Sequence, residues 1–265
     1  MAVVFFTAGF IWFMFEANAN GIKYYEKFDA TSSPAETNAA TDEGEPAQTT
    51  SAPSSAAVKP EVSNPVAQSA KADASYFAKC AFVGSTAASE AAKKVGASDK
   101  TVYFSDTITA ATLETKILPT AYGQCNALHA LSKQMPKMIY IVLDTKAIDY
   151  SKADEVLTEI TDFFDLLSAA IPSASVCVTS LTPATRQSEA LEEGALTREA
   201  ADVFNAKLLN ECTKHKVHYL SVSDSLKDAE GYLDAKYTAE DGSIYYDKLY
   251  TDMASYILTH TVKYE

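Results

Sequence analysis

Hydroxyl, carboxylate and amine side chains follow apolar segments of this chain and are its first candidates for chemistry. Ser85 and Thr86 follow one apolar run. Asp144 and Lys146 follow a longer one, and Asp241 lies in a polar turn near the C-terminus. An acyl-transfer site needs a hydroxyl nucleophile, a neighbouring base, a group that orients the base, and donors for the developing oxyanion. These are the residue types from which such a site is built.

The candidate base is the weakest part of such a site. The four histidines are His129, His215, His218 and His260. His218 begins an apolar run that predicts a strand, and His260 ends the last predicted helix, so both are interpreted as surface or core-edge residues. Thr86 is a hindered nucleophile, because its β-methyl group restricts χ1 and threonine nucleophiles usually use a terminal amine as base.

Lys146 has three interpretations that the sequence leaves open. It is a base for Thr86, a clamp for an acidic ligand, or one half of a solvated ion pair with Asp144. The tyrosines that follow Asp241, namely Tyr245, Tyr246 and Tyr250, have two interpretations. They line a sugar-binding cleft, or they pack against the core with their hydroxyls in water.

Apolar periodicity predicts the elements that position these residues. We predict strands over residues 80–84, 101–105, 138–143, 175–179 and 217–222, and helices over 87–95, 109–117, 121–134, 154–170, 197–214 and 247–260. The run 138–143 has no polar residue, as expected of a central strand that is covered on both faces. Strands that alternate with helices specify an α/β fold: a three-layer α/β/α sandwich with a parallel, flavodoxin-like sheet of about five strands. Ligands of such sheets bind beyond the carboxyl ends of the strands.

Composition divides the chain into three parts. Residues 1–28 hold an uninterrupted apolar run and are interpreted as a signal or membrane anchor, which places the remainder outside the cytoplasm. Residues 29–75 are rich in Ala, Ser, Thr, Pro and Glu and are interpreted as a disordered linker. Residues 76–265 form the folded domain. The domain is tethered to the cell membrane if the leader stays and secreted if it is cleaved.

Charge and cysteine spacing exclude several kinds of site. The chain has 265 residues and a formal charge of −13, which argues against a nucleic-acid partner. Cys80, Cys125, Cys177 and Cys212 lie dozens of residues apart, without the paired spacing of a zinc or redox site. They are interpreted as buried free thiols, although an exported location would permit disulfides. We expect neither a metal nor a cofactor.

At the predicted strand ends the sequence resembles the SGNH, or GDSL-type, hydrolases, in particular small membrane-anchored members from Gram-positive bacteria. The stretch Phe82-Val-Gly-Ser-Thr86 resembles the family's first block, in which Thr86 takes the nucleophile's place after Ser85. In the second block Thr107 stands at or near the oxyanion glycine. The likeness covers most of residues 76–265 and implies the SGNH-hydrolase fold.

The third and fourth blocks depart from the family pattern. In Pro136-Lys-Met-Ile-Tyr-Ile-Val-Leu-Asp-Thr-Lys-Ala147, Asp144 stands at the glycine position and Lys146 at the asparagine position of the family's oxyanion loop. In the last block Asp241 stands unchanged, but Ile244 replaces the catalytic histidine. The resemblance therefore implies a degenerate site at Ser85, Thr86, Thr107, Asp144, Lys146, Asp241 and Ile244.

The resemblance implies an extracytoplasmic pseudo-hydrolase that binds a cell-wall polysaccharide or another envelope component, with no catalytic residue remaining. Two alternatives stay open. One is an active esterase or deacetylase-like acyl hydrolase that uses a rearranged Thr86 or Ser85 nucleophile with Lys146 or Asp241. The other is a protein that contacts its partner through an outer helix. A hydroxyl within about 3 Å of a base would favour the esterase, and a filled cleft would favour the outer helix.

Overall fold

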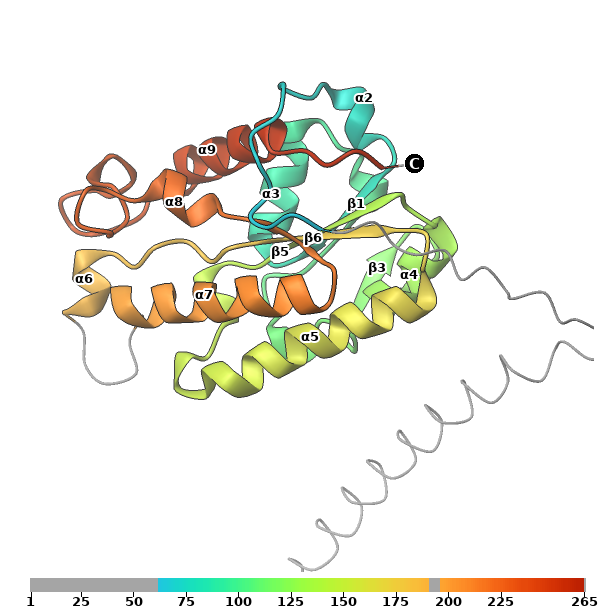
Figure 1. The fold of residues 1–265 in the computed structure, drawn as a ribbon, viewed down its shortest axis with the longest axis horizontal. Helices are drawn as coiled ribbons and strands as arrows, with labels where there is room; N and C mark the ends of the chain where they lie inside the picture. Colours follow the sequence, from blue (N-terminus) through green and yellow to red (C-terminus); the bar gives the residue numbers. More distant parts are fainter. Residues whose placement is uncertain (1–61, 191–195, 265) are drawn as a thin grey trace, which may run out of the picture. The chain divides into compact units, whose positions relative to one another are not determined.

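The computed structural model describes residues 62–190 and 196–264, in which a five-stranded sheet carries helices on both faces (Figure 1). The strands are β1 (Cys80–Gly84), β2 (Val102–Phe104), β5 (Met138–Val142), β6 (Ser175–Thr179) and β7 (His218–Leu220). Their order is β2-β1-β5-β6-β7, and every neighbouring pair is parallel. The predicted α/β sandwich is confirmed. The apolar run 138–143 supplies the central strand, as expected.

Each face of the sheet is covered by its own helices. Helices α3 (Thr86–Val95) and α9 (Tyr246–Thr259) cover one face, together with the short α2 (Ala74–Phe77) and α8 (Val222–Leu226) (Figure 1). Helices α4 (Ala127–Gln134), α5 (Ala153–Ala170) and α7 (Arg198–Lys214) cover the other face. A short helix, α6 (Arg186–Glu189), follows β6. The core therefore has two halves, and successive strand residues alternate between them because side chains in a strand have a period of two.

The helix predicted over 109–117 and the start of the helix predicted over 121–134 are wrong. Residues 110–112 form only one 3₁₀ turn, and β3 (Ile117–Thr120) pairs antiparallel with β4 (Gly123–Asn126). Pro119 cannot donate a helical hydrogen bond, and Gly123 has a φ of 93°, which suits a tight turn. Leu118 is the only residue of the hairpin that is fully buried, so the apolar pattern there is too short to distinguish strand from helix.

The folded domain begins before the predicted boundary at residue 76. The Asn64 side chain bonds the edge strand β7 twice, because Nδ2 donates to Val217 O at 2.8 Å and Oδ1 accepts from Tyr219 N at 2.7 Å. Val66 N also donates to Tyr219 O, and its side chain is buried. Further on, Ala72 N donates to Leu258 O at the end of α9. We name residues 64–72 the N-terminal strap; the predicted linker is wrong over this part, because local composition does not reveal contacts with a distant strand.

The remaining sequence predictions for the N-terminal part fall on residues 1–61, outside the described residues. Among the residues that the structure describes, no helix combines the length and the apolar character needed to cross a membrane. All four cysteines are free: Cys80, Cys177 and Cys212 are buried and Cys125 is half-buried. Burial raises the pKa of the Cys80 thiol to about 12, so it remains protonated at neutral pH.

Candidate functional site

The parallel strands bring several predicted residues to one edge of the sheet. A small cavity, which we name the strand-end cleft, lies there between the loops and the first turns of α9. It is lined by Ala87, Asp144, Thr145, Lys146, Thr182, Ile244, Tyr246, Leu249, Tyr250 and Met253. Of the seven residues that the resemblance singles out, the cleft gathers Asp144, Lys146 and Ile244. Ser85, Thr86, Thr107 and Asp241 are not among its lining residues.

Ser85 and Thr86 lie where β1 meets α3, as the strand-turn-helix pattern predicts. Ser85 is only 2% exposed, and its Oγ accepts a hydrogen bond from Asp144 N at 3.0 Å. This bond joins the loops that follow β1 and β5. Thr86 is half-buried at the first position of α3. Within the described ranges its hydroxyl has no hydrogen bond to a base, so neither hydroxyl is set up as a nucleophile.

The resemblance implies that the backbone N–H at Thr107 would donate to an oxyanion, but this N–H already donates to another group. Thr107 N donates to Ser105 Oγ at 3.2 Å, and the two side-chain hydroxyls lie 3.0 Å apart. Thr107 is exposed. An oxyanion donor has to point at the reacting atom without competing partners, and this one closes a local turn instead.

Asp241 also serves a local turn. Its Oδ1 accepts from Ser243 N at 2.9 Å and from Ser243 Oγ at 2.7 Å, and these hydrogen bonds lower the pKa of the exposed carboxyl. Gly242 follows with a φ of 80°, which completes the turn. In the pattern that the resemblance implies, this acid would orient a histidine at position 244, but Ile244 stands there and cannot transfer a proton.

The four histidines lie away from the cleft. His215 Nδ1 is 2.8 Å from Asp165 Oδ1 at the end of α7, and the ring of His260 stacks on Tyr256 with 3.7 Å between centroids. His218 begins β7, at the opposite end of the sheet from the cleft, and burial lowers its pKa. His129 is in α4. The positions of His218 and His260 agree with their interpretation as surface or core-edge residues.

Lys146 does not form the ion pair with Asp144 that was one of its predicted roles. Asp144 Oδ1 accepts from the backbone N–H of Lys146 at 3.1 Å, which caps a 3₁₀ turn. The Lys146 ammonium lies 5.0 Å from the centre of the Tyr246 ring instead. Hydrogen bonding to Tyr246 raises the pKa of Lys146. A general base at neutral pH needs a lowered pKa, so this environment favours a permanent cation over a proton acceptor.

Apolar side chains fill the strand-end cleft. Leu249, Tyr250 and Met253 of α9 are buried against it, and Ile244 is half-buried beside them. The space that remains is about 10 Å³. A water molecule needs about 10–15 Å³ of such space, so the cleft has no room for a bound ester in this conformation.

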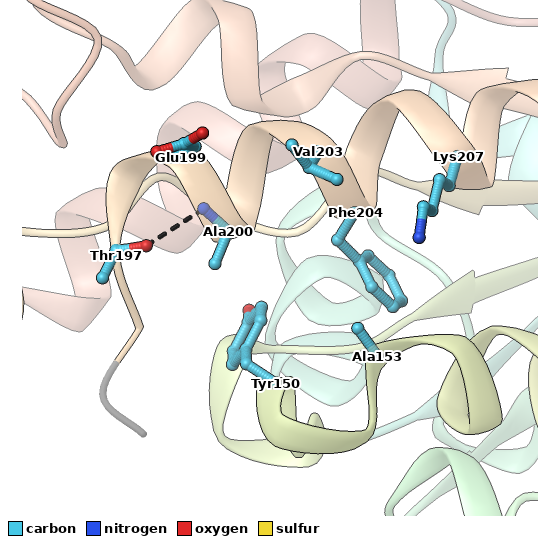
Figure 2. Close-up of a pocket in the computed structure, with 8 residues that line it drawn as sticks. All are labelled: Tyr150, Ala153, Thr197, Glu199, Ala200, Val203, Phe204 and Lys207. Carbon is cyan, nitrogen blue, oxygen red and sulfur yellow. Dashed lines mark hydrogen bonds between the residues drawn. The ribbon is translucent and has the colours of Figure 1, made fainter. Parts of the chain in front are cut away.

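A second, larger concavity was not predicted from the sequence. Figure 2 shows it between Tyr150 and Ala153 on one side and the first half of α7 on the other. Its volume is about 340 Å³, and Ala200, Val203 and Phe204 line the helix side. We name it the α7 groove. Val203 is 48% exposed in this groove. In the sequence it lies outside the apolar stripe of the helix, and an apolar residue off that stripe is the signal that could have indicated the groove.

No metal site emerges from the described ranges, since no three His, Cys, Asp or Glu side chains lie together there in an arrangement that could hold an ion.

No protein-family model and no curated protein matches this sequence. The structure is similar to solved structures of SGNH/GDSL-like hydrolases and esterases. A candidate platelet activating factor from Streptococcus pneumonia is 14% identical, with a TM-score of 0.49, over 68% of this chain and 82% of that chain. A carbohydrate esterase family 3 protein from Talaromyces cellulolyticus is 12% identical, with a TM-score of 0.48, over 68% of this chain and 94% of that chain. A GDSL-like lipase from Bacteroides thetaiotaomicron is 14% identical, with a TM-score of 0.43, over 67% and 84%. At these values the fold class rests on the strand order and register of this chain itself.

Proposed function

We propose that this chain is an SGNH/GDSL-hydrolase-like domain that does not hydrolyse acyl esters and acts as a binding or scaffolding module. The filled strand-end cleft carries the proposal, because Ile244 occupies the position that the resemblance gives to the catalytic histidine and about 10 Å³ of space remains. Loss of nucleophile and base together leaves only the small rate enhancement that comes from binding and oxyanion donors.

The proposed setting is the outer side of a cell membrane. The apolar run within residues 1–28 and the Pro- and Ser-rich sequence that follows support a tethered, extracytoplasmic domain, or a secreted one if the leader is cleaved. The proposed partner is a cell-wall polysaccharide or another envelope component, which follows from the family resemblance.

Hydrolysis of p-nitrophenyl acetate tests the proposal. We expect the full chain to release nitrophenolate at the same rate as the Thr86→Ala variant and as a Ser85→Ala variant, because neither hydroxyl has a base. The measurement is initial rate against enzyme concentration, with the buffer rate subtracted. Activity in the wild type that either variant loses by tenfold or more would establish the alternative, an esterase with a rearranged nucleophile.

A second candidate function, contact with a partner through an outer helix, is favoured by two observations: the strand-end cleft is filled, and the α7 groove lies on the outer layer. The groove offers apolar walls on the outer layer of the sandwich, and Val203 is exposed on it (Figure 2). We expect Val203→Glu to preserve the fold, since the side chain is half in solvent. If the groove is the contact surface, this variant loses at least tenfold in affinity for a partner recovered with the wild type, whereas Lys146→Gln at the cleft does not.

A further inference from the structure

One aromatic ring closes the mouth of the strand-end cleft. Tyr246 comes from the first turn of α9 and remains 36% exposed. Its ring lies near the ammonium of Lys146, at 5.0 Å, and near the ring of Tyr250, at 5.7 Å between centroids. Leu249, Tyr250 and Met253 below it belong to the core. Unlike Leu249, Tyr250 and Met253, the Tyr246 side chain can therefore rotate out of the cleft without disturbing the core.

Few strong interactions hold the Tyr246 side chain in place. A cation–π contact at an exposed site is weak. The N-cap residue Tyr245 makes no side-chain hydrogen bond to the turn. Asp247 reaches Lys94 at 2.7 Å, but the Asp247 side chain is 92% exposed, and such surface ion pairs contribute little to stability. An outward rotation of the Tyr246 side chain thus breaks few strong interactions.

Lys146 then becomes a cation at the open mouth that no salt bridge holds. Within the described ranges no carboxylate lies within 4.0 Å of its ammonium; Asp144 acts on it from a longer distance, while its Oδ1 accepts from the Lys146 backbone N–H. The vacated space is that of the tyrosine side chain, a flat six-membered ring next to the Lys146 ammonium. Its walls are apolar at Ala87 and Leu249, polar at Thr182 and acidic at Asp144.

We propose that the strand-end cleft binds a six-membered ring that bears a carboxylate, which displaces the Tyr246 ring and pairs with Lys146. This inference rests on the proposed binding function and places one ligand class in the strand-end cleft once the Tyr246 ring has moved. The shared chemistry, a ring with a carboxylate, occurs in aromatic acids and in sugar acids. The ring replaces the packing of Tyr246, and the carboxylate exchanges a cation–π contact for a charge-assisted hydrogen bond, which is the stronger of the two.

The test is titration of the ¹⁵N-labelled full chain with phenylacetate, with glucuronate and with the neutral benzyl alcohol. We expect at least one of the two acids to shift the backbone amides of residues 144–146 and 244–250, and benzyl alcohol to bind about tenfold more weakly than that acid. Lys146→Gln is expected to weaken binding of the acid about tenfold. Tyr246→Ala is expected to strengthen it about fivefold, because the side chain that competes for the space is gone.

Lys248→Gln is the matched control. Lys248 is also an exposed lysine near a tyrosine ring, 6.0 Å from that of Tyr237, but it does not line the cleft. Its removal should leave affinity unchanged. The inference is overturned if neither acid binds, if Lys146→Gln binds like the wild type, or if Tyr246→Ala gains nothing while keeping its thermal midpoint. Binding of glucuronate alone, or of phenylacetate alone, identifies which source of the carboxylated ring the cleft accepts.

Ester hydrolysis, measured on the same preparations, separates this inference from the proposed function. Binding of an acid without hydrolysis supports both. Hydrolysis of p-nitrophenyl acetate that depends on Thr86 overturns the non-hydrolytic function and leaves the ligand class standing. Failure of both acids to bind overturns the ligand class alone.

Discussion

Gly84→Ala is expected to lower the free energy of unfolding by about 4 kcal/mol or more, and so to leave little folded protein. An ideal Cβ at this position would lie 2.0 Å from the carbonyl oxygen of Val142, well inside any real contact. Both atoms belong to neighbouring strands at the centre of the sheet, so neither can retreat without breaking the β1–β5 ladder. The φ of Gly84, 145°, adds backbone strain for any L side chain.

The variant Gly123→Ala measures the cost of backbone strain without a steric clash of the added Cβ. Gly123 also has a positive φ, 93°, but nothing lies within 4 Å of the Cβ that alanine would add. Strain alone should cost this variant about 1 kcal/mol. Chemical denaturation of both full-length variants measures the difference. Equal losses at the two positions would contradict the close packing of β1 on β5 at the carboxyl ends of these strands.

Replacement of the N-terminal strap, residues 64–72, with a Gly-Ser stretch of equal length is expected to lower stability by about 3–5 kcal/mol. Burial of the Val66 side chain contributes about 1.5–2 kcal/mol, and each hydrogen bond to the β7 backbone about 1 kcal/mol. The strap also covers the unpaired edge of β7, so its removal should promote association between chains.

The strap prediction is checked by thermal unfolding and by sedimentation of the full chain. The matched control replaces residues 36–44 with the same Gly-Ser stretch, outside the folded domain predicted from composition. Asn64→Ala alone should cost about 1–2 kcal/mol, because it removes two hydrogen bonds and leaves Tyr219 N without its side-chain acceptor. A strap variant that unfolds at the wild-type midpoint would show that residues 64–72 contribute nothing to the stability of the folded domain.

The order of the five parallel strands and of the long helices was accessible from the sequence because it depends on local patterns. The fully apolar run 138–143 predicts a central strand, and the spacing of Val156, Ile160, Phe163 and Leu167 predicts the amphipathic helix α5. The sequence also places Ile244 where the family resemblance would put the catalytic histidine, and an isoleucine cannot transfer a proton wherever it lies. These properties belong to residue types and their spacing, so no knowledge of distant neighbours was needed.

Contacts between distant residues were decided only by the tertiary structure. Lys146 and Tyr246 are a hundred positions apart, and their contact depends on how α9 packs against the loop after β5. That packing places the Tyr246 ring next to the Lys146 ammonium. The Asp144 carboxylate, although close in sequence, is oriented by the hydrogen bond that it accepts from the Lys146 backbone N–H. The strap shows the same dependence, since Asn64 has no partner until β7 presents its edge. Local preference determines which elements form, whereas side-chain partners depend on register and helix docking, which are set by the whole core at once.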